Sequence, residues 1–587
     1  MELKQGFQNG GRFMSSQKAS VILSTGRSTF LDSSQFIAKG MLTVLQAASF
    51  EVFSDSWEIY NCSSNGDLNI GAKGIIHNLN LKNNSITIRK PINITQTILE
   101  GGTLKLEEHT VIDHLSLVDG RLDIHKDVDI VDLNWKKGVI SGGSVNIKYV
   151  TVHGKTKLQF RDTNVQFNNV RFEKSLQNHK VELRGYGNIS LAKNHILEVQ
   201  HNLAINCNGQ DFINRGSISI LGSSVLIFSG CNLKNEGNIT VNPGTTLKCY
   251  SDLTNKGNIA VKENSVAEFD KVDNDEGARL SSNGKLILRK DISIRTDFFW
   301  ADTIETKSES EIWMHLYNTG LSANRDFIKK LVISSGVIYF KQQDISLSET
   351  RIKELHVTGG SFVNKDKLNV EQIVLSSGRI ELGAKITTNL LEFKWGTIMS
   401  EYKKTTLAAK SITFVTIRNK IIQNIVISVS NNIEWMDQYQ DTTILFKRQS
   451  ELIIEKSAAF TYNGTRQFLS YGSDSAIINN GVMQTAESPL PSTVIFQCNL
   501  INAGTFDMSY ARTVNIHGNL KSTNLLEFDK DATVNIYGTT EGNYLMINAP
   551  LIMVKRGSSL KLDSKSKVTN IVVDGILDVS GQKQSGL

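Results

Sequence analysis

The sequence predicts an all-β chain in which coils of about 18–24 residues stack as a parallel β-solenoid. Three observations predict this class: a short motif that recurs at nearly constant spacing, apolar residues two apart almost everywhere, and only 5 Pro among 587 residues. Alternating apolar residues favour strands with one buried face, and scarce Pro leaves backbone N–H groups free for strand pairing. Because one coil is too small to bury its own apolar face, the pattern predicts that successive coils stack on one another.

The motif is clearest in the middle of the chain. Asn214–Ile220 reads Asn-Arg-Gly-Ser-Ile-Ser-Ile, and its outline returns at Asn235–Val241 and Asn255–Val261. Gly two positions after Asn suits a turn that needs φ > 0, and the alternation that follows suits a short strand. We expect two inward ladders, formed by Ile218, Ile239 and Ile259 and by Ile220, Val241 and Val261. We also expect the stacked Asn amides to hydrogen-bond to one another and to turn backbone, with ligand binding by this lane as the alternative.

A second form of the coil begins with Gly and extends the pattern over most of the chain. Its units are 102–106, 120–124, 143–147, 336–340, 360–362, 378–382 and 396–398. Near the carboxyl end, Thr513–Gly518 and Thr533–Gly538 share five of six residues at a spacing of 20, and Asn502–Met508 repeats the Asn-Gly form. If each coil adds ~4.8 Å, roughly 29 coils would build a monomeric rod on the order of 140 Å long.

The regularity of the pattern divides the chain. The sequence predicts a β-solenoid over 1–290, irregular coils or a loop insertion over 291–330, a β-solenoid over 331–400, less regular β coils over 401–470, and a β-solenoid over 471–587 that is either complete or truncated.

Composition excludes several classes of protein. A hydrophobic fraction of 40% is too high for a disordered chain, and a net charge of +6 from 64 basic and 58 interspersed acidic residues gives no nucleic-acid footprint. We find no apolar run that could span a bilayer and no signal peptide. The five cysteines, Cys62, Cys207, Cys231, Cys249 and Cys498, are too few for a disulfide scaffold. We expect buried thiols, with a disulfide between neighbouring coils as the alternative.

The Asn-x-Gly-x-Ile-x-Val units at 214–220, 235–241, 255–261 and 502–508 resemble the repeats of filamentous-haemagglutinin-type adhesins and related large extracellular parallel β-helices. The resemblance implies a right-handed β-helix at the cell surface or outside the cell, which displays or spaces binding surfaces. The amino-terminal secretion module and the anchor of such proteins are not visible, so the chain is either complete or an internal piece of a longer one.

Parallel β-helices also include enzymes that cut acidic polysaccharides, and fragments of their motifs occur in this sequence. Arg351-Ile352-Lys353 looks like one motif of polygalacturonases, and His153-Gly154 and His517-Gly518 look like another. Their order and spacing do not fit, and no Asp-Asp pair occurs to supply a general acid and base. We expect Arg351 and Lys353 to be outward strand residues on either side of an inward Ile352.

Other chemistry has little support in the sequence. The carboxylates of Asp123, Asp127, Asp129 and Asp132 could bind Ca²⁺, but their alternation with apolar residues favours a solvated strand face. The residues His125, His153, His179 and His195 lack zinc-ligand spacing, and no His lies near Cys62 or Cys498. The sequence therefore predicts no catalytic, cofactor-binding or metal-ligating residue and no cofactor. A site assembled on neighbouring coils from Asp127, Asp129 and Lys148 would escape a motif search.

Aromatic rings on a rigid face are the remaining route to binding, because sugars and proteins stack on them. The candidates are Trp135, Trp300, Trp313, Trp395 and Trp435. We expect Trp135 and Trp395, each shortly before a Gly-led strand, to be buried at coil corners. The resulting hypothesis is a non-catalytic structural or adhesive solenoid that binds glycans or surface proteins; the alternative is a polysaccharide-acting lyase or hydrolase with an unrecognised site.

Overall fold

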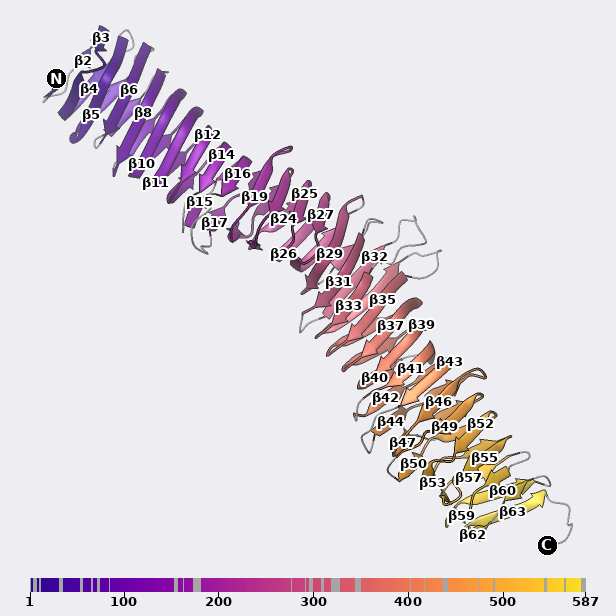
Figure 1. Ribbon diagram of the computed structural model, residues 1–587. Helices are drawn as coiled ribbons and strands as arrows, with labels where there is room; N and C mark the ends of the chain where they lie inside the picture. The colour runs from indigo at the N-terminus through magenta and orange to yellow at the C-terminus, as the bar shows by residue number, and fades with distance from the viewer. Residues whose placement is uncertain are drawn as a thin grey trace. The chain divides into compact units, whose positions relative to one another are not determined.

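The computed structural model confirms the fold class. It describes all of residues 1–587 except 1, 4–7, 10–11, 31–34, 53–55, 65–66, 71–73, 84, 153–156, 162, 173–180, 276, 291, 295–298, 308–310, 318–327, 344–349, 402, 416–417, 436–441, 473, 489–490, 543–545, 564–565, 569 and 582–587. The described residues form strands β1 to β63 and no helix. Parallel strands stack as a β-solenoid of about 23 turns (Figure 1).

The chain divides into two compact units, Met1–Phe299 and Trp300–Leu587. The expectation of roughly 29 coils was too high, because many turns are longer than twenty residues. In unit 1, Ile92 of β10 (Ile92–Leu106) pairs in the next turn with Thr110 of β11 (Thr110–Ile124), whereas Val170 of β16 (Asn164–Phe172) pairs in the next turn with Leu197 of β19 (Ile196–Val199). Turns of different length are therefore still joined by parallel strand pairing.

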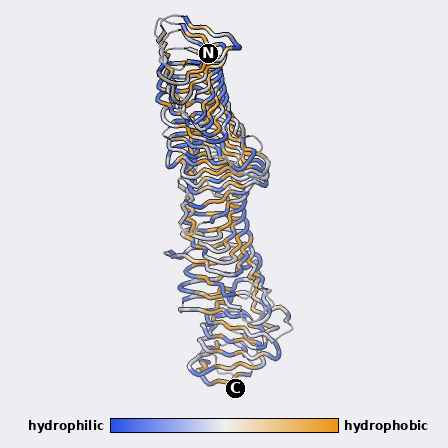
Figure 2. Tube along the Cα trace, turned by 90° about the vertical axis from the view of Figure 1, so that its left-hand side faces the viewer, coloured by the Kyte–Doolittle hydropathy of each residue, from blue (hydrophilic) through white to orange (hydrophobic). Residues whose placement is uncertain are grey.

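Two successive turns in the middle of unit 1 contain three short strands each. One turn holds β20 (Leu203–Asn206), β21 (Asp211–Asn214) and β22 (Ser217–Ile220), and the next holds β23 (Val225–Ser229), β24 (Asn232–Asn235) and β25 (Asn238–Val241). Pairing joins β20 with β23, β21 with β24, and β22 with β25. Apolar residues recur at equivalent places from turn to turn (Figure 2).

Both predicted inward ladders are confirmed. Ile218, Ile239 and Ile259 pair in register through β22, β25 and β27 (Asn258–Val261), and each side chain is buried. Thr240 lies on the outer face of β25. The register therefore follows from the alternation in the sequence.

The predicted Asn lane is a buried hydrogen-bond ladder. Nδ2 of Asn214 donates to Oδ1 of Asn235 at 2.7 Å, and Nδ2 of Asn235 donates to Oδ1 of Asn255 at 2.7 Å. The ladder continues to Asn274, and its members are fully buried. Nδ2 of Asn235 also donates to the carbonyl of Asn258 at 3.2 Å, so the amides tie turn backbone to the strands. A similar ladder in unit 2 runs from Asn479 to Asn502, where Nδ2 of Asn479 donates a hydrogen bond to Oδ1 of Asn502 at 2.8 Å. The lane is therefore structural.

The glycines beside this lane are required for a different reason from the one predicted. Gly216, Gly237 and Gly257 do not adopt positive φ. A Cβ atom at Gly237 would lie 2.0 Å from the carbonyl oxygen of Gly216, and one at Gly257 would lie 2.0 Å from that of Gly237. Close stacking of successive corners thus excludes any side chain here. Positive φ is found in the other form of the coil, for example at Gly378.

Segment 401–470, which lacks a clear Gly anchor, has an aromatic interior. The ring of Trp435 lies 5.3 Å from Phe414 and 5.8 Å from Phe468, measured between ring centroids. The buried guanidinium of Arg466 lies 4.9 Å from the Trp435 ring, and its Nη1 donates to Oγ1 of Thr442 at 3.0 Å. Large rings and a buried cation fill the wider turns here, with hydrogen bonds compensating for the burial of charge.

The tryptophans only partly follow expectation. Trp135 and Trp435 are fully buried, whereas Trp300 and Trp395 are 41% and 40% exposed. The prediction of a buried Trp395 was wrong. The corner before Gly396 directs this ring outward, and the guanidinium of Arg418 covers it at 4.5 Å.

Candidate functional site

A hollow on unit 1 lies on the outer face of one sheet, and we call it the amide groove. Its volume is about 480 Å³. The sheet strands beneath it are β12 (Asp127–Trp135), β14 (Ser144–Val152), β16, β18 (Ile189–Leu191) and β21. Alternation turns Val128, Val145 and Val165 into the core, where each is 1% exposed, so that the residues on either side of each valine face outward.

Two lanes of outward side chains line the amide groove. Strand pairing and chain direction place Asp127, Ser144, Asn164 and Asn188 in the first lane. The second lane is Asp129, Asn146, Gln166, Ser190 and Ile213. The sequence gives no local motif for these residues, since neighbours within a lane are about twenty positions apart. Only the register brings them together.

Side-chain length explains the hollow. Short Ser and Asn side chains form much of the middle, whereas His109 precedes β11 at one end and Arg215 follows β21 at the other. His109 and Arg215 are exposed. The groove is therefore a shallow depression across several turns, and it suits an extended ligand better than a compact one.

Charge is confined to the two ends of the amide groove. Nε2 of His109 lies 3.1 Å from Oδ2 of Asp129, and Nδ2 of Asn146 donates to Oδ1 of Asp129 at 3.2 Å. At the other end, Nε of Arg215 donates to Oε2 of Glu236 at 3.0 Å. The described lining residues between these ends are amides, hydroxyls and apolar groups.

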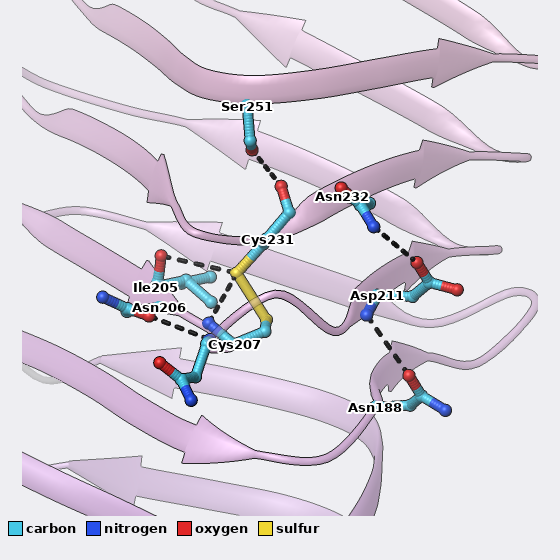
Figure 3. The surroundings of a disulfide bond; sticks show 9 residues. Asn188, Ile205, Asn206, Cys207, Asp211, Cys231, Asn232 and Ser251 are labelled. Carbon is cyan, nitrogen blue, oxygen red and sulfur yellow. Dashed lines mark hydrogen bonds between the residues drawn. A yellow bond between two sulfur atoms is a disulfide. The ribbon is translucent and has the colours of Figure 1, made fainter.

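A disulfide lies in the corner next to this sheet (Figure 3). Cys207 follows β20 and Cys231 follows β23, and their sulfur atoms are bonded across two successive turns with the Cα atoms 4.8 Å apart. Beyond the corner, the amide of Asp211 donates to Oδ1 of Asn188 at 3.2 Å, which links β21 to the first lane. The disulfide therefore fixes the corner from which β21 enters the groove.

The expectation of a thiol was wrong for this pair. Cys207 and Cys231 differ in the number of residues that separate each of them from the repeat Asn that follows. A tight turn after Cys207 accommodates its additional residues: the backbone amide of Gln210 donates to the carbonyl of Cys207 at 3.1 Å. Cys62, Cys249 and Cys498 are buried thiols, as expected. Burial raises the pKa of Cys62 and of Cys498 to about 12, so neither is a thiolate nucleophile at neutral pH.

The four carboxylates considered for Ca²⁺ are dispersed. Asp127 and Asp129 line the groove, whereas Asp132 pairs with Nδ1 of His114 at 3.0 Å. Although burial opposes its charge, hydrogen bonds from Ser141 and Arg121 keep the pKa of Asp123 below its ordinary value. The part of the chain that the structure describes contains no group of three side chains able to hold a metal ion.

The assembled site of Asp127, Asp129 and Lys148 is found only in part. Both carboxylates line the amide groove, but Lys148 is not among its lining residues, and its ammonium group lies 5.2 Å from the Tyr149 ring. Lys148 lies midway along β14, between Ile147 and Tyr149, which pair with Ile130 and Asp132 of β12. The groove therefore lacks the lysine that this hypothesis required.

The remaining candidate motifs do not converge on a site. Ile352 is buried and Lys353 lies outward with its Nζ 4.0 Å from Oε2 of Glu371, as expected for a strand. His517 stacks on Tyr537 with ring centroids 4.2 Å apart. His153, His179 and the side chain of Arg351 lie outside the described residues. Sequence reasoning missed the amides of the groove, whose only signal was that they occupy outward strand positions.

Comparisons of the chain with known protein families, curated proteins and solved structures find no match. Among the described residues, no helix has the length and apolarity needed to cross a membrane.

Proposed function

We propose that this protein is a non-catalytic structural or adhesive β-solenoid that works outside the cell or at its surface and holds an extended macromolecule in the amide groove. The observation that carries the proposal is the two-lane groove itself, which is long, polar and open along five stacked strands. A rigid stack of turns keeps these side chains in fixed positions, so that a ligand is bound at little cost in protein ordering.

The disulfide supports an extracellular location. Such bonds persist in oxidising compartments and are rare in the cytosol, and Cys207–Cys231 joins two turns of the solenoid itself. Thiol counting on protein from its native source tests this. We expect alkylation of Cys62, Cys249 and Cys498 alone in denaturant without reductant. Alkylation of all five cysteines would contradict an oxidising location.

A polysaccharide-acting enzyme is the second candidate, because Asp127 and Asp129 lie two positions apart on one strand face of the groove. Two strand positions correspond to about 6.5 Å, near the separation of carboxylates in inverting glycosidases. Asp129, however, is engaged by His109 and Asn146.

The deciding experiment incubates the full chain with a panel of polysaccharides and follows both retention on immobilised polymer and chain shortening. Retention without shortening supports the adhesive function. Shortening that Asp127→Asn abolishes would replace it with the enzyme, and neither retention nor shortening would refute both.

A further inference from the structure

We infer that the amide groove selects a neutral, hydroxyl-rich linear polysaccharide over a polyanion or a peptide. This inference rests on the proposed function and adds the chemistry of the ligand. It is drawn from the side chains of the two lanes, from the charges at the groove's ends and from the pairing of the strands beneath.

The middle of the groove offers donors and acceptors side by side. Ser144, Asn164 and Asn188 lie in the first lane, and Asn146, Gln166 and Ser190 lie in the second. An amide or a hydroxyl both donates and accepts, as does a sugar hydroxyl, so a neutral glycan can satisfy both kinds of group. A sulfate or carboxylate only accepts, and would face the amide oxygens without a proton to offer them.

The ends of the groove disfavour an anionic chain. Asp127 and Asp129 stand together at one end, where a polyanion would meet two like charges. The cation at the other end, Arg215, is already engaged by Glu236 at 3.0 Å. A nucleic acid would also need a basic track along the groove, which the described lining residues do not provide.

The backbone beneath the groove disfavours a peptide. β14 pairs with β12 on one side and β16 on the other, and β16 pairs in turn with β18. An extended peptide gains affinity by adding to a free sheet edge. The groove floor is a sheet face in which these strands already bond to one another, so it offers side chains rather than an edge.

The repeat of the solenoid sets a length scale for the ligand. Successive turns are ~4.8 Å apart, close to the length of one sugar ring along a linear glycan. Each ring can therefore meet a similar pair of polar side chains, one from each lane. We expect affinity to rise with each added sugar until the glycan spans the five strands from β12 to β21, and then to level off.

Calorimetric titration of the full chain with linear gluco- and manno-oligosaccharides of graded length, and with oligogalacturonides of matched length, tests the inference. We expect the neutral series to bind with the length dependence above, and the double variant Asn164→Ala, Gln166→Ala to lose at least tenfold in affinity. Both side chains are exposed, so the variant should keep the urea midpoint of the parent. Asn258→Ala is the matched control: it removes an exposed amide, bonded to Asn238 at 2.8 Å, outside the groove.

The outcomes separate this inference from the proposed function. If oligogalacturonides bind as tightly as neutral chains and the double variant weakens them, the groove holds a polymer but its neutral selectivity is refuted. If the double variant and the Asn258→Ala control bind neutral chains like the parent, the assignment to the groove is refuted. Absence of binding by either series refutes both proposals.

Discussion

Asn235→Asp is the sharpest test of the buried ladder, because it changes one atom type and almost no volume. Asn235 is fully buried and receives a hydrogen bond from Asn214. It donates from Nδ2 to Oδ1 of Asn255 at 2.7 Å and to the carbonyl of Asn258 at 3.2 Å. A carboxylate keeps the accepted bond but cannot donate, so two oxygens would face each other at the former Asn255 contact.

The magnitude follows from these contacts. Two lost hydrogen bonds contribute about 1 kcal/mol each, and a buried carboxylate without adequate partners adds several more. We expect the free energy of unfolding at pH 7 to fall by about 4 kcal/mol. Protonation restores one donor, so the pKa of the new carboxyl in the folded state should exceed its unfolded value. The loss should then be small near pH 4 and grow as pH rises through and above the unfolded pKa.

Hydrogen exchange of the amides of β24 and β25, together with urea unfolding at pH 4 and pH 7, measures both effects. Because solenoids unfold locally, exchange identifies the turns that open. Asn258→Asp is the control, since Asn258 is exposed; we expect a change below about 1 kcal/mol. A loss at Asn235 equal to the control, or one independent of pH, would refute the ladder as a source of stability.

Three further variants test the fold. Gly237→Ala places a Cβ 2.0 Å from a backbone oxygen and should lower the urea midpoint strongly. The control is Gly222→Ala, where φ is +69° and no atom lies within 4 Å of the added Cβ, so we expect a much smaller loss. Equal losses for the two variants would contradict the close stacking of successive corners. Ile239→Asp should lower the free energy of unfolding by several kcal/mol and Thr240→Asp by less than ~1 kcal/mol, because only Ile239 faces the core. Denaturant titration measures both losses, and equal losses would show that the register is wrong. Burial lowers the pKa of His517, so the unfolded chain binds its proton more readily and stability should fall as pH drops below about 6.5. His517→Gln should reduce this pH dependence of the urea midpoint, and an unchanged pH profile would exclude the effect.

The sequence by itself determined the class of fold, the inward ladders and the Asn lane. These depend on period and alternation, and the stacking of Asn214, Asn235 and Asn255 repeats a local pattern at each turn. Such contacts can be recognised in a repetitive sequence because each coil packs on a near copy of itself, so that the same residue types meet at equivalent positions. The right residues could therefore be named from the sequence, even where the reason for a glycine was wrong.

Only the tertiary structure decided the site and the cysteine pairing. Asp127, Asn146 and Gln166 belong to different turns, and their meeting depends on turn lengths that vary along the chain. The tight turn after Cys207 likewise brings it to Cys231 although their offsets from the repeat differ. Contacts that repeat are visible in a sequence, whereas contacts made once depend on how each loop closes, and the packing of the folded chain determines that closure.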